Sequence, residues 1–209
     1  TFVKRTNGWG VSMQRYFDQV SVLPATGIAA GGFYAQGLLT DAGAPDDDLD
    51  HSAVGATATL TSIEGKVIEL DIEADGSIFH RGVPLSEEDW TLTVSLPGHL
   101  TSHLPLALSK VGEDGELIGV TVTFAAALAA GDVNGDDVVD ILDAIAIRDA
   151  AGTADRAADI NLDGVVDAAD LSYVELNWLV RNPTADTVPT PQAKHKGITL
   201  DQVLAAFAG

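Results

Sequence analysis

Two twelve-residue stretches carry oxygen-bearing side chains at the same offsets. They read DVNGDDVVDILD over residues 132–143 and DINLDGVVDAAD over residues 159–170. In each stretch Asp or Asn occupies positions 1, 3, 5, 9 and 12, and a Val-Val pair stands at positions 7 and 8. Hard divalent cations prefer such oxygens, and a calcium-binding loop supplies them from positions 1, 3, 5, 7, 9 and 12. The spacing therefore predicts two calcium loops.

The predicted ligands form two matching sets. They are Asp132, Asn134, Asp136, the Val138 carbonyl, Asp140 and Asp143 in the first loop, and Asp159, Asn161, Asp163, the Val165 carbonyl, Asp167 and Asp170 in the second. Each set suffices for one Ca²⁺, so we expect two ions. Solvated Asp/Asn turns are the alternative for a single cluster of this kind, and Mg²⁺ is the alternative metal, although it prefers fewer protein ligands.

Three other loop positions carry structural expectations. The valine at position 8, Val139 or Val166, is expected to turn into a core and tie its loop to it. The carboxylate at position 12 opens a helix, where it meets the positive helix end. Position 6 tends to need a positive φ, which Gly164 adopts freely and Asp137 adopts at a cost. On this ground we expect the first site to be the weaker one.

The loops need elements that position them, and the sequence behind each loop favours a short helix. Apolar residues recur on one face of each helix, at Ile141, Leu142, Ile145 and Ile147 in the first and at Leu171, Val174, Trp178 and Leu179 in the second. Residues 183–197, rich in Pro and Thr, have the composition of a linker. Residues 198–209 predict an amphipathic helix that needs a surface to cover, with Thr199 and Gln202 as a capping box.

The region before the loops has the texture of a β-sandwich. Short β-prone runs between residues 33 and 124 are broken by turn residues such as Asp75-Gly76 and Pro97-Gly98, and the first of these runs is FYAQGLLT. We therefore expect a mainly β chain with a small α domain: an antiparallel β-sandwich over residues 33–128, a paired-loop domain over residues 129–182, the linker and the final helix. Residues 1–32 are an uncertain N-terminal segment.

The paired loops resemble the dockerin family, over about residues 131–182. Dockerins have Asp rather than Glu at position 12 and a helix behind each loop. The resemblance implies two pseudo-symmetric loop–helix units that bind a cohesin domain on another protein, often through loop positions 10 and 11. Those positions hold Ile141-Leu142 in one copy and Ala168-Ala169 in the other. The two faces are therefore not equivalent, which argues against symmetric binding.

The preceding region is similar to the carboxypeptidase-regulatory-like domain, a transthyretin-like β-sandwich. The likeness is carried by ADGSIFHRGVPLSEEDWTLTVSLPGHLTS, residues 74–102, with its DG turn, its VP break and its Pro-Gly turn, and it extends over about residues 33–128. The resemblance implies a non-catalytic module.

Composition limits the partners. The chain has 209 residues and a net charge of −20, so nucleic acid or an anionic membrane would be repelled, whereas cations are natural counterparts. It has no cysteine and no apolar run long enough to span a bilayer. The opening TFVKRTNGWG has neither an initiator Met nor a signal-peptide core, which predicts a processed or excised piece. We expect an extracellular or cell-surface location.

Weaker motifs favour ordinary structural roles. LPATG, residues 23–27, spells a sortase recognition pentapeptide but lies far from the C-terminus. DDDLDH, residues 46–51, is a solvated loop or an extra calcium site, and His99 and His103 are spaced for zinc only on a helix. Trp90 and Tyr34 would stack on a sugar only if they are exposed. No nucleophile with a base, and no carboxylate pair in a cleft, is evident, so we expect no enzyme.

Three functions fit these features. The first is an extracellular, calcium-binding attachment module that docks onto a cohesin-like partner. The second is a calcium-rigidified subunit of a self-assembling surface filament or layer, whose partners are copies of the same chain in a homo-oligomer. The third is the C-terminal, non-catalytic part of a secreted polysaccharide-degrading enzyme.

Overall fold

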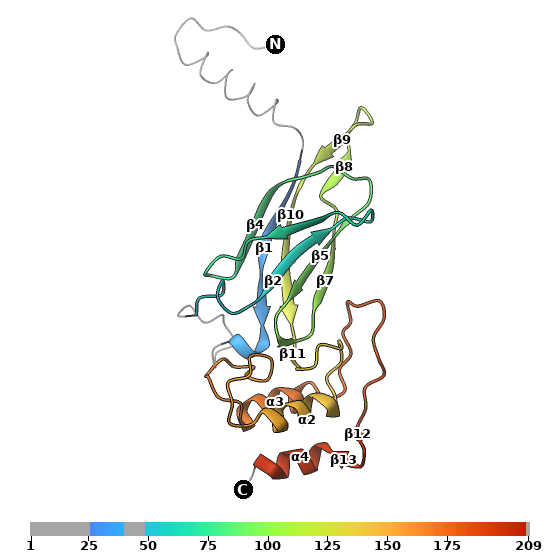
Figure 1. The fold of residues 1–209 in the computed structure, drawn as a ribbon. Helices are drawn as coiled ribbons and strands as arrows, with labels where there is room; N and C mark the ends of the chain where they lie inside the picture. The colour runs from blue at the N-terminus through green and yellow to red at the C-terminus, as the bar shows by residue number, and fades with distance from the viewer. Residues whose placement is uncertain (1–25, 40–48, 208–209) are drawn as a thin grey trace, which may run out of the picture.

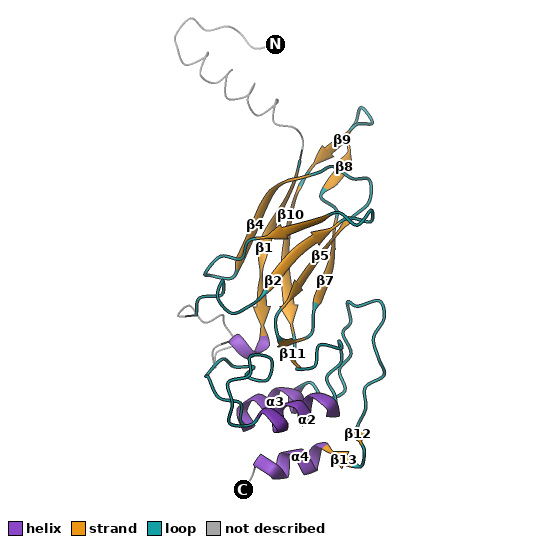
Figure 2. Cartoon of the chain, in the orientation of Figure 1, coloured by secondary structure: helices purple, strands orange, loops and turns teal. Residues whose placement is uncertain are grey.

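A β module is followed by a smaller helical part, as the fold class predicts (Figures 1 and 2). The structure is a computed structural model that describes residues 26–39 and 49–207. The β module contains β1 (Gly27–Ala35), the 3-10 helix η1 (Gln36–Leu38), β2 (Thr57–Thr61), β3 (Val67–Leu70), β4 (Ser77–Val83), β5 (Trp90–Ser95), β6 (Gly98–His99), β7 (Ser102–Leu106), β8 (Ser109–Val111), β9 (Leu117–Gly119) and β10 (Thr121–Leu128).

Two sheets form the layers of the sandwich. One has the strand order β3-β2-β5-β7 and the other has the order β10-β1-β4, while β8 and β9 form a separate hairpin. Because successive side chains of a strand point to opposite faces, each strand turns every second residue inward. The inward residues of both sheets form one core, which includes Ala29, Phe33, Leu60, Ile78, Leu92 and Val94. Full burial of each larger side chain stabilises the fold by about 2 kcal/mol.

The first strand begins earlier than the sequence suggests. The expected strand FYAQGLLT starts at residue 33, whereas β1 begins at Gly27 and gives way to η1 after Ala35. The glycines in this segment lie in a strand, where they allow neighbouring groups to pack closely, and they do not form a loop. A Cβ at Gly31 would lie 2.7 Å from a ring carbon of Phe124, so only glycine leaves room for that ring.

One strand pairing also departs from the antiparallel expectation. β1 and β10 run parallel, with the register Ile28↔Thr121 to Ala35↔Leu128. The other strand pairings among the described residues are antiparallel. Parallel neighbours need a long connection, and here almost the whole β module separates the two strands in sequence.

The helical part has its own core. It contains β11 (Ala130–Asp132), α2 (Ile141–Ala150), α3 (Ala168–Leu176), the hairpin strands β12 (Lys194–His195) and β13 (Ile198–Thr199), and α4 (Leu200–Phe207). The core buries side chains from all three helices, including Ile141, Ile147, Leu171, Val174 and Val203. The expected second helix ends early, because α3 stops at Leu176 and leaves Trp178 and Leu179 beyond it.

The C-terminal residues lie on the helical part. The predicted helix is α4, which packs on α2 and α3 and so covers the surface it needs (Figure 1). Gln202 Oε1 accepts a hydrogen bond from Thr199 N–H at 3.0 Å, which is one half of the predicted capping box. Residues 183–197 have the composition of a linker but are not a free one. Their backbone bonds to α2 through Gln192, whose carbonyl accepts from Ile141 N–H.

The end of the sandwich holds the helical part. β11 pairs with β6, with Ala130 opposite His99 and Asp132 opposite Gly98. Gln36 Oε1 accepts hydrogen bonds from Ala130 N–H at 3.2 Å and from Asn177 Nδ2 at 2.6 Å. Arg156 of the helical part makes a second contact with the β module, because its Nε and Nη2 both donate to the Val54 carbonyl. The two parts are thus joined by backbone pairing and by side-chain hydrogen bonds.

No helix among residues 26–39 and 49–207 has both the length and the apolar character needed to cross a membrane.

Candidate calcium centre

The first loop folds around the carboxylates of Asp132 and Asp143. Asp132 Oδ1 accepts from the N–H groups of Gly135 and Asp136 at 2.8 and 3.1 Å, and its Oδ2 accepts from Asp137 N–H at 2.9 Å. Asp143 accepts from the N–H groups of Val133, Asn134 and Asp140 at 2.9, 3.1 and 2.8 Å. The carboxylates at positions 1 and 12 thus both bind backbone N–H groups of the same loop.

The second loop repeats this arrangement. Asp170 accepts from the N–H groups of Ile160, Asn161 and Asp167 at 2.7, 3.3 and 2.9 Å. In both loops the Asn at position 3 donates through Nδ2 to the Asp at position 5, over 3.2 Å in the first loop and 3.0 Å in the second. The shared bonds at positions 3, 5 and 12 show that the sequence repeat is a structural repeat. Position 1 differs, because Asp159 accepts only from Gly164 N–H, at 3.1 Å, where Asp132 accepts from three N–H groups.

The aspartates at positions 9 and 12 also start the helices. Asp140 caps α2 and Asp167 caps α3, each accepting from an N–H group two residues on over 2.7 Å. Each forms a reciprocal capping box with the position-12 aspartate, Asp143 or Asp170. One oxygen of Asp140 and one of Asp167 are therefore bonded to the start of their own helix.

The position-8 valines tie each loop to the segment behind the other helix. Val139 exchanges backbone hydrogen bonds with Leu179 and Val180, which follow α3, while Val166 exchanges them with Gly152 and Thr153, which follow α2. Both valine side chains are buried, as predicted. The two loop–helix units therefore hold each other in a reciprocal, pseudo-two-fold manner.

Backbone strain is shared equally between the loops. Positions 4 and 6 both have positive φ: 73° and 65° for Gly135 and Asp137, and 59° and 92° for Leu162 and Gly164. Each loop thus places one non-glycine residue in the left-handed region. Leu162 offsets its cost by packing against the sandwich core, and Asp137 by hydrogen bonds to Asn182. The Gly-to-Asp difference at position 6 no longer argues for a weaker first site.

The loop carboxylates are buried where an isolated charge is costly. Burial, together with the charge of Asp132, raises the pKa of Asp143 to about 7, and burial raises the pKa of Asp132 to about 6. Burial likewise raises the pKa of Asp170, and the nearby Asp159 adds to the shift. A neighbouring opposite charge would reverse these shifts, and a divalent cation is such a charge.

The donor set fits a cation better than it fits any protein partner present. Asp159 Oδ1 is buried without a hydrogen-bond partner. Among residues 26–39 and 49–207 the ion pair found is Arg148–Asp149, which lies outside both loops. The same residues gather no group of three or more His, Cys, Asp or Glu side chains that would hold a metal alone. Calcium loops also take ligands from Asn side chains and from a backbone carbonyl at position 7, and both loops have these groups at the corresponding positions.

The other candidate motifs have structural roles where they are described. Within LPATG only Thr26 and Gly27 are described, and Gly27 is a buried residue of β1, so the Thr-Gly bond of the pentapeptide lies against the sandwich. Residues 46–48 of DDDLDH lie outside the described residues. His51 is buried and hydrogen-bonded to the Leu49 and Ala74 carbonyls. Both features argue against the special roles weighed for these motifs.

The remaining candidates are placed as follows. His99 bonds through Nδ1 to the Pro97 carbonyl and through Nε2 to Gly37 N–H, and His103 Nδ1 bonds to Thr93 Oγ1. The two imidazoles therefore serve different contacts, on β6 and β7. Trp90 is buried and cannot stack on a ligand, whereas Tyr34 is exposed.

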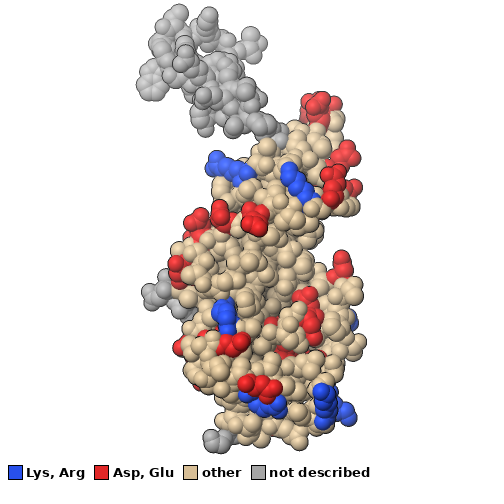
Figure 3. Space-filling model, in the orientation of Figure 1, with Lys and Arg blue, Asp and Glu red and all other residues tan. Residues whose placement is uncertain are grey.

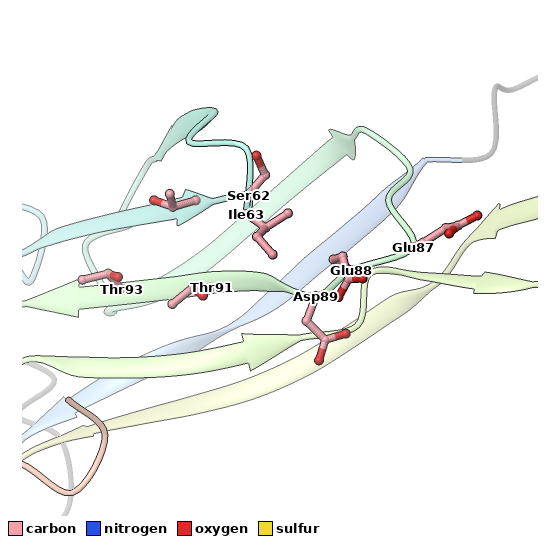
Figure 4. A pocket seen from close by; sticks show the side chains of 8 residues that line it. Ser62, Ile63, Glu87, Glu88, Asp89, Thr91 and Thr93 are labelled. Atoms are coloured by element: carbon pink, nitrogen blue, oxygen red, sulfur yellow. The ribbon is translucent and has the colours of Figure 1, made fainter. Parts of the chain in front are cut away.

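An open hollow lies at the end of the sandwich away from the loops. It has a volume of about 610 Å³ and is lined by Thr61, Ser62, Ile63, Glu87, Glu88, Asp89, Thr91 and Thr93 (Figure 4). Acidic side chains are also spread over the rest of the visible face (Figure 3). The hollow is open to solvent rather than enclosed.

Comparison with known families supports the assignment of the loops. Residues 130–177 match the model of the Dockerin type I domain. This region contains both loops, α2 and α3. No curated protein sequence matches the chain. The chain thus carries a dockerin type I domain behind a β module.

Two solved structures share the fold of most of the chain. Both are interface mutants of a type II cohesin–X–dockerin complex from Acetivibrio cellulolyticus. The C-terminal interface mutant aligns at 15% identity with a TM-score of 0.51, and the N-terminal interface mutant at 17% identity with a TM-score of 0.50. Each alignment covers 75% of this chain and 97% of the other. The shared fold therefore extends beyond the dockerin domain into the β module.

Proposed function

We propose that the chain is a non-enzymatic, extracellular attachment module whose dockerin domain binds a cohesin-type domain on another protein when both loops hold Ca²⁺. The observation that carries the proposal is the pair of bonded loops, complete in ligand types, within residues 130–177 that match the dockerin type I model. The twelve ligands named from the sequence belong to this proposal, as do the boundaries of the domain at residues 129 and 182. Extracellular calcium reaches millimolar levels, which suits sites of this class.

The two candidate partner faces differ in accessibility. At loop positions 10 and 11, Ala168 and Ala169 are exposed at the start of α3. Their counterparts on α2 are covered, because Ile141 is buried and Leu142 is half-buried. We therefore assign partner binding to the α3 face. This supports the one-sided recognition that the sequence suggests.

The β module is proposed to be a spacer and support. Its end carries the backbone pairing between β6 and β11 and the hydrogen bonds that hold the dockerin domain. The likeness to a carboxypeptidase-regulatory-like domain and the fold shared with X–dockerin pairs both favour a non-catalytic role.

One feature that favours a self-assembling filament is the amphipathic C-terminal helix. An unattached amphipathic helix would seek another copy of the chain, but α4 packs on α2 and α3 of its own chain and buries Val203 there. We therefore prefer attachment to a cohesin-type partner over assembly of identical copies.

Binding to a panel of purified type I and type II cohesin domains tests the proposal. Isothermal titration in millimolar calcium and in excess EGTA is expected to show calcium-dependent binding to at least one of them. Ala169→Arg, which places a long charged side chain on the exposed α3 face, is expected to weaken binding more than about tenfold because it disrupts interface packing. Ala127→Arg, the same change on exposed β10, is the matched control and is expected to bind normally.

Three results would contradict the proposal. Binding that is equally strong in EGTA would separate attachment from calcium. Equal losses in the two arginine variants would place the interface elsewhere. Calcium-dependent polymer in light scattering, without cohesin binding, would favour self-assembly instead.

A further inference from the structure

The first calcium loop is gripped by the chain that follows α3. We name residues 181–193 the C-terminal strap. Its residue Asn182 is buried and donates from its backbone N–H to the Asp137 carbonyl at 2.9 Å and from Nδ2 to Asp137 Oδ1 at 2.7 Å. Asp137 is the non-glycine residue at position 6, with a φ of 65°. Asn182 thus holds the loop in its least favourable backbone conformation.

The same Asn182 side chain connects the loop to the sandwich. Its Nδ2 also donates to the Thr101 carbonyl at 2.6 Å, and its Oδ1 accepts from Thr184 N–H and Oγ1 at 2.9 and 2.8 Å. All of its hydrogen-bonding groups are therefore engaged between three segments. A buried and fully bonded amide of this kind fixes the relative position of the segments it joins.

The strap makes a second contact at the far end of the loop. Gln192 N–H donates to Oδ2 of Asp140, the position-9 ligand, at 2.7 Å, and the Gln192 carbonyl accepts from Ile141 N–H at 3.1 Å. Asp140 is only 1% exposed. Because these bonds reach positions 6 and 9, the strap spans the half of the loop that closes around a cation.

The second loop has no equivalent strap among the described residues. Gly164 at its position 6 faces open space on the side where a Cβ would stand, and Asp167 at its position 9 is exposed. The position-7 valine shows the same contrast, since Val138 is fully buried and Val165 is 40% exposed. The two loops thus share one ligand pattern, but the strap covers only the first.

We propose that the C-terminal strap is a positioning element for the first calcium site, so that cation binding at loop 1 and docking of the strap are thermodynamically linked. Asn182 is its positioning residue. The strap pre-arranges Asp137 and Asp140, which lowers the ordering cost of binding, and by reciprocity Ca²⁺ in loop 1 stabilises the docked strap and α4 behind it. Loop 2 is independent of the strap. The inference rests on the proposed calcium sites but not on the identity of the partner.

Calcium titration of the full chain with one loop disabled at a time tests the linkage. Asp163→Ala leaves loop 1 alone, and Asp136→Ala leaves loop 2 alone. Adding Asn182→Ala is expected to weaken loop 1 about tenfold, the scale of one buried hydrogen bond to a charged group, and to leave loop 2 within about twofold. Thr190→Ala is the matched control, because Thr190 is an exposed strap residue, and it is expected to change neither loop.

Hydrogen exchange gives a readout independent of affinity. In the Asp163→Ala chain, calcium is expected to slow exchange at the amides of Asn182 and Gln192, whereas in the Asp136→Ala chain it is expected to leave them unchanged. Unchanged loop-1 affinity in the Asn182→Ala chain, or equal weakening of both loops, would overturn the linkage. A chain that binds calcium with this pattern but binds no cohesin would overturn the proposed function alone.

Discussion

Asp170 has several structural roles in the second loop. It is fully buried, accepts three backbone N–H groups, and closes the capping box of α3. A buried carboxylate without a cationic partner is costly, since its charge has lost its water. A cation bound in the proposed second site would offset this cost.

Replacing Asp170 with Asn tests this at the residue scale. The change keeps the size of the side chain but removes its charge, so we expect the affinity of loop 2 for calcium to fall more than about 100-fold while loop 1 keeps its own. Calcium titration should then change from two sites to one. Asp149→Asn, which alters an exposed aspartate on α2, is the control and should retain both sites. Two sites of unchanged affinity in the Asp170 variant would contradict the assignment.

His99 makes the junction of the two modules sensitive to pH. It is buried, and burial lowers its pKa to about 4. Its Nδ1–H donates to the Pro97 carbonyl, so Nε2 accepts from Gly37 N–H. Protonation of Nε2 would place its N–H against the Gly37 N–H, so that this hydrogen bond would be lost. Above pH 6.5 the neutral form is present in both states. Below pH 6.5, His99 becomes protonated in the unfolded chain, whereas in the folded chain it becomes protonated only near pH 4.

Stability is therefore expected to fall as the pH is lowered from about 6.5 to 4, by up to about 3 kcal/mol from this group. Denaturant unfolding at pH 7 and at pH 5, in the parent chain and in His99→Gln, measures the effect. The difference in unfolding free energy between the two pH values should be smaller in the variant, since the loop carboxylates titrate equally in both. An equal difference would contradict the role of His99.

At the scale of elements, α4 is the cover of the α2–α3 pair. Val203 is its fully buried residue, and Leu200, Leu204 and Phe207 pack around the same core. A short helix is marginal alone in water and gains its stability from such packing. The amphipathic pattern at the C-terminus is thus satisfied within the chain.

Val203→Ala is expected to destabilise the helical part by about 2 kcal/mol, because it leaves a cavity where two methyl groups were packed. Val180→Ala is the matched control. Val180 is 37% exposed, and its loss should cost less than about 0.5 kcal/mol. Thermal unfolding in saturating calcium measures both. Equal effects would mean that α4 contributes no core.

The sequence predicted elements best where spacing is strict. The two repeated loops, the buried position-8 valines and α4 all follow from fixed intervals between residues. β1 was misplaced because its glycines resemble a loop, and only the ring of Phe124 explains why Gly31 stands in a strand. The composition of residues 183–197 predicts only a linker, because the bonds that dock the strap are made by backbone groups and by the side chains of Asn182 and Thr184, which leave no periodic signal. Leu162 at a positive φ was equally invisible, since its support comes from the distant sandwich core.

For the whole molecule, calcium is expected to couple the two modules. Asp132, the first proposed ligand of loop 1, lies on β11 opposite Gly98 of the sandwich, and Ile160 of loop 2 lies against Gly37 and Gly98. A cation that binds only the folded state stabilises it, by about 2.7 kcal/mol per site at a hundredfold excess over its dissociation constant.

Removal of calcium by a chelator is therefore expected to loosen residues 130–207 first and the sandwich strands β2 and β5 last. Hydrogen exchange in calcium and in EGTA measures the order. Faster exchange should extend from the loops to β6 and η1, and the amides of β2 and β5 should keep their protection. Uniform loss of protection, or none, would contradict the coupling.

The parallel pairing of β1 with β10 determines how the chain bears force. β1 enters the sandwich at Gly27 and β10 leaves it at Leu128 toward the dockerin domain, so the two strands are loaded at opposite ends when the chain is pulled between these points. Tension then slides the strands past each other and strains their register from Ile28↔Thr121 to Ala35↔Leu128 together. Shear of this kind resists better than opening a ladder one rung at a time. A load applied between the start of β1 and the helical part would thus be borne by this whole register at once.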